Sequence, residues 1–185
     1  MVVNTGTQLV DAEKVLDAGN IKEGDIVADF GAGAVGHYVF PAARRVGKSG
    51  KVYAVDIQKS VLDALKGRMV IEGLSNIDLV WGDLERLRGT RIDDNSVDCV
   101  FLMNLFSVLV SRDLALQEVM RVLKPGGTLV VIDWRPTGAP FGPEISKRFS
   151  KDKAVGAITI AGFQKGKEFF PGPYHYGLVF SKIKD

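Results

Sequence analysis

The 185-residue chain is 46% hydrophobic and 25% charged, which is the composition of an ordinary soluble domain. Its single cysteine, Cys99, cannot form an internal disulfide, and one cysteine with two separated histidines excludes a metal site built on a cysteine cluster. No uninterrupted apolar run reaches the roughly 18 residues of a membrane span, and the N-terminus lacks the pattern of a secretory signal. We therefore expect one cytoplasmic domain, residues 1–185, without a membrane span.

The net charge of +2 is distributed unevenly along the chain. Residues 1–134 carry 15 Lys and Arg against 18 Asp and Glu, whereas residues 135–185 carry 9 against 4. A basic excess of this kind can attract an anionic substrate, but more often it forms a solvated surface. Nothing in the pattern supports nucleic-acid binding, and we do not expect it.

Short apolar runs alternate with amphipathic segments along the first two thirds of the chain. In chain order, the pattern predicts helix 8–18 with Thr7 as its N-cap, strand 25–29, helix 36–46, strand 51–56, helix 60–72, strand 77–81, strand 97–103, helix 113–123 and strand 128–133. The segment Lys124–Gly127, with a proline and two glycines, indicates a turn before the last of these strands. Strands and helices that alternate in this way form a doubly wound α/β sheet with parallel strands.

The pattern changes after Trp134. Residues 135–150 are rich in proline and glycine, and we interpret them as a loop that can act as a substrate lid together with the N-terminal helical region, residues 1–20. The chain closes with a predicted helix at 151–160 and predicted strands at 163–170 and 174–182. Because the connection between these two strands is short, they should pair as an antiparallel hairpin at one edge of the sheet.

A glycine-rich turn follows the first predicted strand. Gly31, Gly33 and Gly36 let the backbone turn tightly and approach a ligand closely, because glycine has no Cβ. The helix that follows points free N–H groups at a negative group of the ligand. Strand 51–56 ends in Asp56, and an acid at this distance from the turn suits the two hydroxyls of a ribose. The pattern therefore predicts a nucleoside-containing cofactor.

The acids around the turn favour a cofactor with a cationic amine over a dinucleotide. A glycine motif of this spacing also occurs in NAD and FAD proteins, so alone it does not identify the ligand. Asp29 stands two residues before Gly31, where its charge would oppose a pyrophosphate but attract an amine. Gly82-Asp83, after strand 77–81, adds an acid that can accept from the exocyclic amine of an adenine.

Four successive segments resemble the motifs of class I S-adenosylmethionine-dependent methyltransferases. They are Asp29–Gly33, Asp56, Gly82-Asp83 and Arg121–Gly127, and the resemblance runs from about residue 21 to residue 182. The Arg121–Gly127 stretch and the strand end Val131–Trp134 make the chain most similar to small C-methyltransferases of ubiquinone and menaquinone biosynthesis. The resemblance implies a Rossmann-like, three-layer α/β/α domain with strand order 3-2-1-4-5-7-6 and strand 7 antiparallel.

The resemblance also implies a cofactor, S-adenosylmethionine, and a place for each matching residue. Asp29 and the start of the next helix would lie near the amino-acid end of the cofactor, and Asp56 would bind both ribose hydroxyls. Asp83 would accept from the adenine amine, and Asn104 would lie near the reacting methyl. A simple turn residue is the alternative for these two, and a loop-capping acid is the alternative for Asp29 and Asp56. The complete predicted cofactor-binding set is Asp29, Gly31, Ala32, Gly33, Gly36, His37, Asp56, Ile57, Gly82, Asp83, Leu84 and Asn104.

The activity that the resemblance implies is in-line transfer of a methyl group to an acceptor, here most simply a small molecule. Such a displacement depends on alignment and requires no protein nucleophile. His175 is the candidate general base because its intrinsic pKa lies near neutrality, and a structural histidine in the hairpin is the alternative. A lid this short indicates an open site or one completed in a homodimer.

The loop after strand 97–103 departs from two patterns of the family. It contains Asn104-Leu105-Phe106-Ser107 instead of the Asn-Pro-Pro-aromatic signature of enzymes that methylate amino groups of bases or glutamine. Related small enzymes often have a histidine where this chain has Ser107, so any role of that histidine in activating the acceptor would be vacant here. The acceptor itself is not identified. Two other functions stay open: a protein that binds the cofactor without transferring its methyl group, and an NAD-dependent oxidoreductase, against which Asp29 and the terminal hairpin argue.

Overall fold

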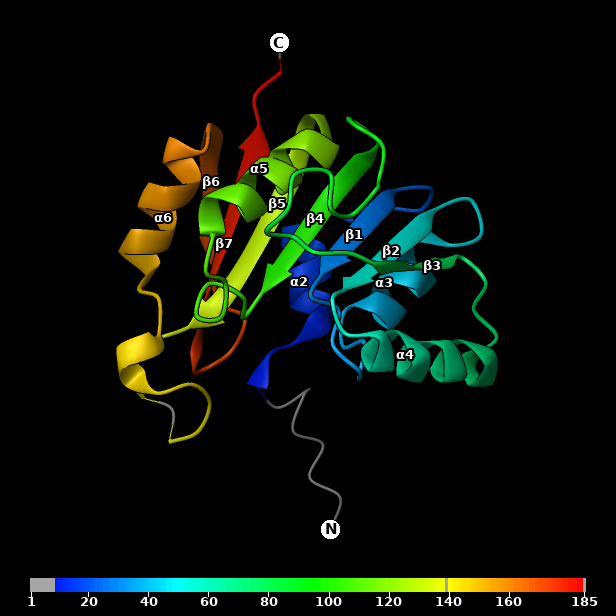
Figure 1. The fold of residues 1–185 in the computed structure, drawn as a ribbon, viewed down its shortest axis with the longest axis horizontal. Helices are drawn as coiled ribbons and strands as arrows, with labels where there is room; N and C mark the ends of the chain where they lie inside the picture. The colour runs from blue at the N-terminus through cyan, green and yellow to red at the C-terminus, as the bar shows by residue number, and fades with distance from the viewer. Residues whose placement is uncertain (1–8, 139, 185) are drawn as a thin grey trace.

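A computed structural model describes residues 9–138 and 140–184 of the chain, and its centre is a seven-stranded sheet (Figure 1). The strands are β1 (Ile26–Phe30), β2 (Lys51–Asp56), β3 (Ile77–Trp81), β4 (Val97–Met103), β5 (Leu123–Trp134), β6 (Phe163–Phe169) and β7 (His175–Lys182). Their order is β3-β2-β1-β4-β5-β7-β6, and β7 runs antiparallel to both of its neighbours. The predicted fold, strand order and terminal hairpin are therefore confirmed.

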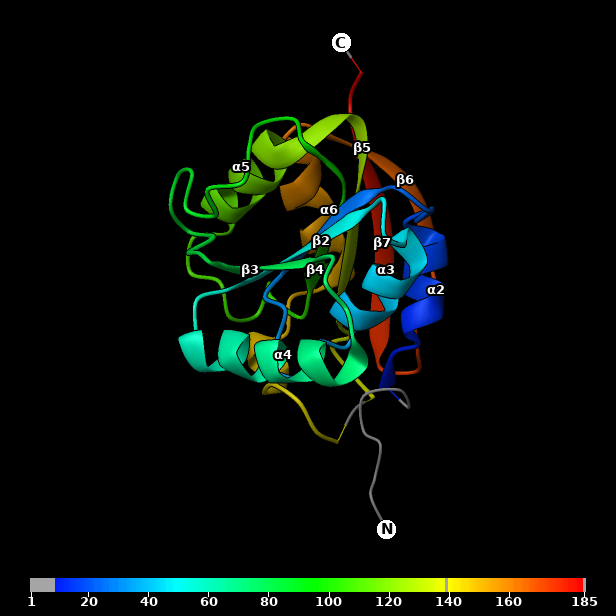
Figure 2. The same cartoon turned by 90° about the vertical axis from the view of Figure 1, so that its right-hand side faces the viewer.

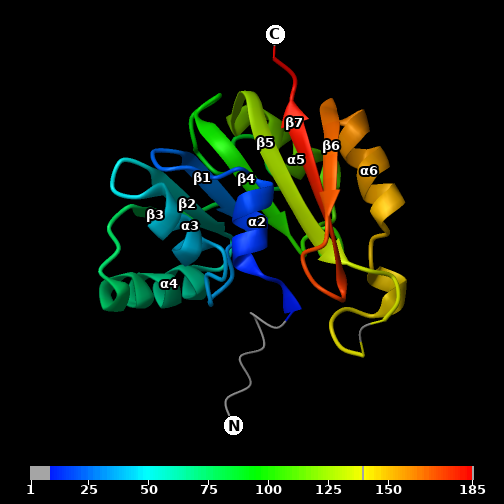
Figure 3. The same ribbon diagram turned by 180° about the vertical axis from the view of Figure 1, so that it is seen from behind.

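Two layers of helices cover the sheet, which Figure 2 shows from the side. Helices α2 (Ala12–Ala18), α3 (Val39–Val46) and α4 (Lys59–Glu72) pack on one face, and α5 (Arg112–Val122) and α6 (Lys151–Ile160) on the other. Figure 3, seen from behind, has α2 and α3 toward the viewer. None of the helices in the described part of the chain is both long and apolar enough to cross a membrane.

The central strands are apolar on both faces because each face meets a helix layer. Successive side chains of a strand point to opposite faces of the sheet. In β4, Phe101 belongs to the core beneath α3, and its neighbours Val100 and Leu102 belong to the core beneath α5. This explains why the strand appears in the sequence as a continuous apolar run rather than an alternating one.

Most predicted element ends agree with the structure to within one residue. Strands β2, β3 and β4 and helix α6 have the predicted bounds, and the predicted ends of β1, β6, β7, α4 and α5 differ by one residue. The exceptions are the starts of α2, α3 and β5.

Helix α2 begins at Ala12, four residues after its predicted start. The carboxylate of Asp11 accepts a hydrogen bond from the N–H of Glu13, so Asp11 is the N-cap. The predicted cap, Thr7, lies outside the described residues.

Helix α3 begins at Val39 rather than at Gly36. Gly33 and Gly36 have φ angles of 63° and 57°, which a right-handed helix cannot contain. The glycine turn therefore extends further than predicted. Pro41 consequently falls in the first turn of α3, where its missing N–H leaves no helical hydrogen bond unmade.

The turn predicted at Lys124–Gly127 is wrong, because these residues belong to β5. Val97 and Cys99 are two residues apart in β4, but their partners in β5, Leu123 and Thr128, are five apart. The residues between these partners bulge out of the ladder, and pairing resumes after them. The proline and the glycines therefore mark a bulge at the start of the strand.

Residues 135–138 and 140–150 contain one short 3₁₀ helix, η1 (Ile145–Lys147), and are otherwise loop, as predicted. This segment leaves the carboxyl end of β5, at the edge of the sheet where the loops after β1 and β4 also lie (Figure 1). Such a position suits a lid, and its action as a lid stays a prediction.

Candidate functional site

The loops that follow β1 to β4 enclose a groove of about 320 Å³ at the carboxyl edge of the sheet. Between β1 and β4 the strand order reverses, which is where open α/β sheets bind their ligands. The lining residues are Gly31, Val55, Asp56, Ile57, Gln58, Gly82, Asp83, Leu84, Glu85, Leu105, Val108 and Leu109. Six of the predicted cofactor residues therefore line the same groove.

The glycine turn folds back against the end of β2. The N–H groups of Gly31 and Ala32 both donate to the carbonyl of Val55, at 2.9 and 3.0 Å. Gly31 has a φ of 79°, and a Cβ there would lie 2.8 Å from the side chain of Leu105. By contrast, a Cβ at Gly33 would meet no described atom within 4 Å. The space over Gly33 is open, as its predicted role requires.

Gly36 and His37 contact other parts of the protein. A Cβ at Gly36 would lie 2.5 Å from the ring of Phe40, so this glycine permits close packing under the turn. The Nε2 atom of His37 lies 2.9 Å from the carbonyl oxygen of Val10, in the segment before α2. The predicted place of these two residues beside the cofactor carboxylate stays a prediction.

Asp29, near the end of β1, is a buried acid without a partner. Its side chain is 1% exposed, and neither carboxylate oxygen has a hydrogen-bond partner in the described part of the chain. Burial, and then the nearby charge of Asp56, raise the pKa of Asp29 from 3.8 to about 7. A buried and unpaired carboxylate costs folding free energy, and a cationic ligand would offset that cost.

Asp56 ends β2 and is held by the backbone of two loops. Its Oδ2 atom accepts from the N–H of Gly33 at 3.2 Å, and its Oδ1 atom accepts from the N–H of Gln58 at 2.9 Å. The carboxylate is thereby fixed in the groove wall, and each oxygen keeps a lone pair for a ligand hydroxyl. The next residue, Ile57, is 58% exposed and offers an apolar surface in the same groove.

The residues after β3 complete the groove. The N–H of Gly82 donates to the carbonyl of Asp56 at 3.2 Å, which joins the ends of β2 and β3. Asp83 accepts from the N–H of Glu85 at 2.9 Å and so caps its own turn, while Leu84 is buried beneath it. Asp83 therefore has the turn role that was the alternative to cofactor binding, and it also lines the groove.

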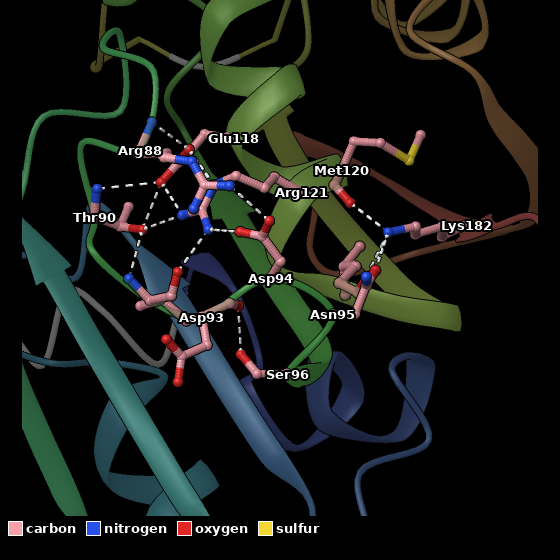
Figure 4. Close-up of polar contacts among 12 residues, drawn as sticks. Arg88, Thr90, Asp93, Asp94, Asn95, Ser96, Glu118, Met120, Arg121 and Lys182 are labelled. Atoms are coloured by element: carbon pink, nitrogen blue, oxygen red, sulfur yellow. Dashed lines mark hydrogen bonds and ion pairs between the residues drawn. The ribbon is translucent and has the colours of Figure 1, made fainter.

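A buried ionic network fixes the loop that carries Asp83 (Figure 4). Glu118 of α5 is fully buried and accepts from the N–H groups of Arg88 and Thr90, both at 3.1 Å. Arg121, one turn later in α5, donates to the same carboxylate at 2.6 and 2.9 Å. Arg121 was predicted only as part of a motif, and Glu118 was not predicted to have a role. An acid and a base spaced i, i+3 on a predicted helix were the available signal.

The loop after β4 contributes two buried polar atoms, Asn104 Oδ1 and Ser107 Oγ, that have no hydrogen-bond partner among residues 9–138 and 140–184. Asn104 has a φ of 57°, and its N–H donates to the carbonyl of Ile132 at 2.8 Å. Left-handed backbone at a residue other than glycine and unsatisfied polar atoms both concentrate at ligand sites. The turn alternative explains the backbone of Asn104 but not its unpaired side-chain oxygen.

Asp133, which is not among the predicted site residues, lies at the end of β5 beside this loop. It is fully buried and accepts from the N–H groups of Phe106 at 2.9 Å and Trp134 at 2.7 Å. Burial raises its pKa from 3.8 to about 6. The signal was an acid at the end of a buried strand, the same pattern that selected Asp29 and Asp56.

His175 begins β7 and lies opposite Trp134 in the ladder, with the two ring centres 4.2 Å apart. It is 1% exposed, and neither ring nitrogen has a hydrogen-bond partner within the described structure. The general-base role stays a prediction, and a structural role in the hairpin stays its alternative. Burial and the charges of Arg148 and Arg135 lower its pKa from 6.5 to about 4. A base with so low a pKa removes protons poorly near neutral pH, and the neutral ring is better suited to accept a hydrogen bond.

Known proteins of similar sequence share this domain. Residues 28–131 match the methyltransferase domain family. The ubiquinone/menaquinone biosynthesis C-methyltransferase of Hydrogenovibrio crunogenus is 31% identical over 141 residues, which are 76% of this chain and 54% of that protein. The chain therefore spans about half the length of the curated relatives it matches.

Solved structures agree with the sequence match. A SAM-dependent methyltransferase from Aquifex aeolicus is 30% identical, has a TM-score of 0.89, and aligns over 97% of this chain and 94% of its own. The [4+2]-cyclase SpnF, 17% identical with a TM-score of 0.79 over 94% of this chain and 80% of its own, shows the fold alone. Because the family match covers more than half of the chain and the Aquifex likeness almost all of it, the chain belongs to the methyltransferase domain family.

Proposed function

We propose that this chain is an S-adenosylmethionine-dependent methyltransferase that acts on a small-molecule acceptor. The observation that carries the proposal is the Asp29 carboxylate, which is buried, lacks a partner among the described residues and lies beside the open glycine turn. A cofactor with a cationic amine would supply the missing charge, whereas the pyrophosphate of a dinucleotide would add a like charge. The names of the Hydrogenovibrio and Aquifex relatives support the same activity.

The groove suits the adenosine part of this cofactor. Asp56, fixed by two backbone N–H groups, can accept from both ribose hydroxyls, and Asp83 can accept from the adenine amine. Ile57 and Val108, which are 58% and 65% exposed, offer apolar surfaces from two loops to a flat ring. The residues present therefore fit the cofactor.

The protein's part in the reaction is alignment. The bound cofactor supplies a methyl group on a sulfonium, so its carbon is already activated. Holding the acceptor in line with that carbon can lower the barrier by up to about 7–11 kcal/mol. Asn104 Oδ1 and Ser107 Oγ are polar atoms that can orient groups there, and neutral His175 can accept a hydrogen bond from an acceptor hydroxyl.

For the acceptor, we propose a molecule with an apolar ring. Trp134, Phe141 and Tyr174 form a continuous aromatic cluster, with ring centres 6.1 Å apart for Trp134 and Phe141 and 5.1 Å apart for Phe141 and Tyr174. His175 contacts the same indole. A quinone-like ring, methylated at carbon, agrees with this cluster and with the names of the curated relatives. A homodimer that completes the site stays a prediction.

The test is calorimetric titration of the purified chain with S-adenosylmethionine, S-adenosylhomocysteine and NADH. We expect micromolar binding of the first two, reduced about 100-fold in Asp56→Ala, because a carboxylate that binds two hydroxyls is lost. Asp78→Ala is the control. This exposed acid of β3 pairs with Lys51 at 2.8 Å away from the groove, and its removal should change affinity less than twofold.

Each other result identifies an alternative. Binding of NADH alone contradicts the proposal and indicates hydride chemistry. Binding of the methyl donor without transfer of its labelled methyl group to any of a panel of quinols and phenols indicates a non-catalytic binding protein. Because a cyclase shares this fold, transfer itself has to be measured.

A further inference from the structure

A buried cluster joins the cofactor side of the site to the acceptor side. We call it the Asp133 junction, and it consists of Asp133, Phe106, Phe149 and Tyr176. Its members come from four parts of the fold: Asp133 from the end of β5, Phe106 from the loop after β4, Phe149 from the segment before α6, and Tyr176 from β7. The junction therefore connects segments that are distant in the sequence.

On the cofactor side, the junction and Arg112 of α5 together fix the backbone of Phe106 at both ends. Its N–H donates to Asp133 Oδ2 at 2.9 Å, and its carbonyl accepts from Arg112 Nε at 2.6 Å. Its neighbours belong to the candidate site: Leu105 lines the groove, 2.8 Å from where a Cβ at Gly31 would stand, and Ser107 has a buried hydroxyl without a partner among the described residues. The position of loop 104–111 thus depends on Asp133.

On the acceptor side, the same cluster holds the end of the segment that leaves β5. The ring of Phe149 stacks on that of Phe106, with centres 5.2 Å apart and planes 9° apart. The hydroxyl of Tyr176 donates to the carbonyl of Phe149 at 3.0 Å, and Tyr176 pairs with Asp133 in the ladder of β5 and β7. The end of β5, from which the segment leaves, is held too, because the other oxygen of Asp133 accepts from the N–H of Trp134.

A carboxylate is an expensive way to fill this position. Burying it costs free energy that two backbone N–H donors offset only in part, whereas an apolar side chain would avoid that cost but remove the partner of both N–H groups. The carboxylate instead fixes geometry, because its two oxygens hold the backbone of the loop after β4 and the backbone at the end of β5 in one relation. Methyl transfer depends on such geometry because small misplacements of the reacting atoms cost rate.

We propose that Asp133 and Tyr176 are positioning residues that hold loop 104–111 and segment 135–149 in one fixed relation, so that a single junction sets the cofactor site and the acceptor site. The roles of the two sites rest on the proposed function. The mechanical link between the two segments does not, and it can be tested without any ligand.

The test uses two variants of the full chain. Asp133→Asn keeps the shape but turns an NH₂ group toward one of the two N–H donors, and Tyr176→Phe removes only the hydrogen bond to Phe149. Asp98→Asn is the matched control, because Asp98 accepts from the N–H of Ile26 at 2.9 Å at the opposite edge of the sheet. Hydrogen exchange of the free protein and calorimetry with S-adenosylhomocysteine are measured for all three, with melting temperature as a check on global stability.

We expect amide exchange to accelerate at least tenfold in both segments together in Asp133→Asn and in Tyr176→Phe, although the hydroxyl of Tyr176 bonds only the acceptor-side segment. The dissociation constant of S-adenosylhomocysteine should rise at least tenfold in Asp133→Asn. Asp98→Asn should lower the melting temperature without either effect, which separates positioning from a merely structural role.

Faster exchange in only one of the segments, or an affinity of Asp133→Asn within twofold of the parent, overturns the proposal. If Asp133→Asn does not fold, the response of loop 104–111 to Tyr176→Phe decides the question. If the parent chain does not bind S-adenosylhomocysteine, the proposed function fails, and the exchange measurements still decide whether the junction couples the two segments.

Discussion

The proposed cofactor side and the proposed acceptor side of the site differ in how their polar groups are satisfied. On the cofactor side, Asp29 and Asn104 keep buried oxygens that no described residue bonds. On the acceptor side, the guanidinium of Arg148 donates to the carbonyls of Pro143 and Phe141 at 2.9 and 2.8 Å, both in its own segment. The cofactor side has buried polar atoms that a ligand can bond, whereas the polar groups of the acceptor side bond mainly to one another.

This difference explains why the two sides are unequally informative. A buried acceptor without a partner indicates that the ligand supplies a donor or a positive charge. A loop whose carbonyls are bonded within the loop gives little indication of its ligand. His175, with both ring nitrogens unpaired in the described structure, is the exception on the acceptor side. Three substitutions, taken in order of their expected effect on cofactor binding, test whether the division is real.

The largest effect is expected from Gly33→Ala. A Cβ at this position meets no described atom within 4 Å, so it would fill space that the proposed cofactor uses rather than space that the fold uses. We expect the dissociation constant of S-adenosylhomocysteine to rise at least 100-fold. The fold should lose only about 1 kcal/mol, because the φ of 63° disfavours alanine.

Gly73→Ala is the control for backbone strain. Gly73 ends α4 with a φ of 65°, and a Cβ there also meets no described atom within 4 Å. The two variants should therefore have similar melting temperatures, and calorimetry should find cofactor affinity unchanged in Gly73→Ala. Equal affinity of the two variants would show that the open space over Gly33 is not part of the site.

The cofactor side could be predicted from the sequence because its chemistry is local. Gly31, Gly33 and Asp29 lie within five residues of one another, and a strand followed by a glycine turn fixes their geometry. Asp56 was predictable for the same reason, as an acid at the end of a buried strand. The pattern did not show that Gly36 serves packing against Phe40, because that contact depends on the path of α3.

The contacts that support the site could not be predicted in this way because they join distant segments. Asp133 and Phe106 are 27 residues apart and meet only when β4 and β5 pair. Glu118 and Thr90, 28 residues apart, meet only when α5 packs beside the loop after β3. The bulge at Lys124–Gly127 was missed because proline and glycine occur in turns and bulges alike.

The second-largest effect on cofactor binding is expected from Asp29→Asn. Removal of the charge that would pair with the cofactor amine should raise the dissociation constant of S-adenosylmethionine about 10- to 30-fold at pH 8. This is the lower part of the range of about 1.5–3 kcal/mol for a hydrogen bond to a charged group, because asparagine keeps a hydrogen-bonding oxygen. In the parent, the pKa of Asp29 near 7 means that a cationic ligand must displace a proton below that pH. Parent affinity should therefore fall as the pH drops from 8 to 5, and that part of the fall should vanish in the variant.

In the ligand-free chain, Asp29→Asn should raise stability although it weakens ligand binding. The pKa of Asp29 is higher in the folded chain than its ordinary value of 3.8, so its contribution to stability is complete below that value and is lost as the pH rises through about 7. Asp29→Asn should thus melt at a higher temperature than the ligand-free parent at pH 8 and show no such gain at pH 4. A variant that is less stable at pH 8, or that binds as tightly as the parent, would contradict the cation site.

The smallest effect on cofactor binding is expected from His175→Gln. If His175 belongs to the acceptor side, S-adenosylhomocysteine affinity at pH 7.5 should stay within twofold of the parent.

The effect of His175→Gln should appear instead in the pH dependence of the free energy of unfolding. Burial and two nearby guanidinium groups lower the pKa of His175 from 6.5 to about 4, so its contribution to stability is complete above pH 6.5 and is lost as the pH falls toward 4. Glutamine does not titrate, so the variant should lose less stability than the parent between pH 6.5 and 4 in chemical denaturation. A tenfold loss of cofactor affinity would place His175 on the cofactor side and remove the division between the two sides.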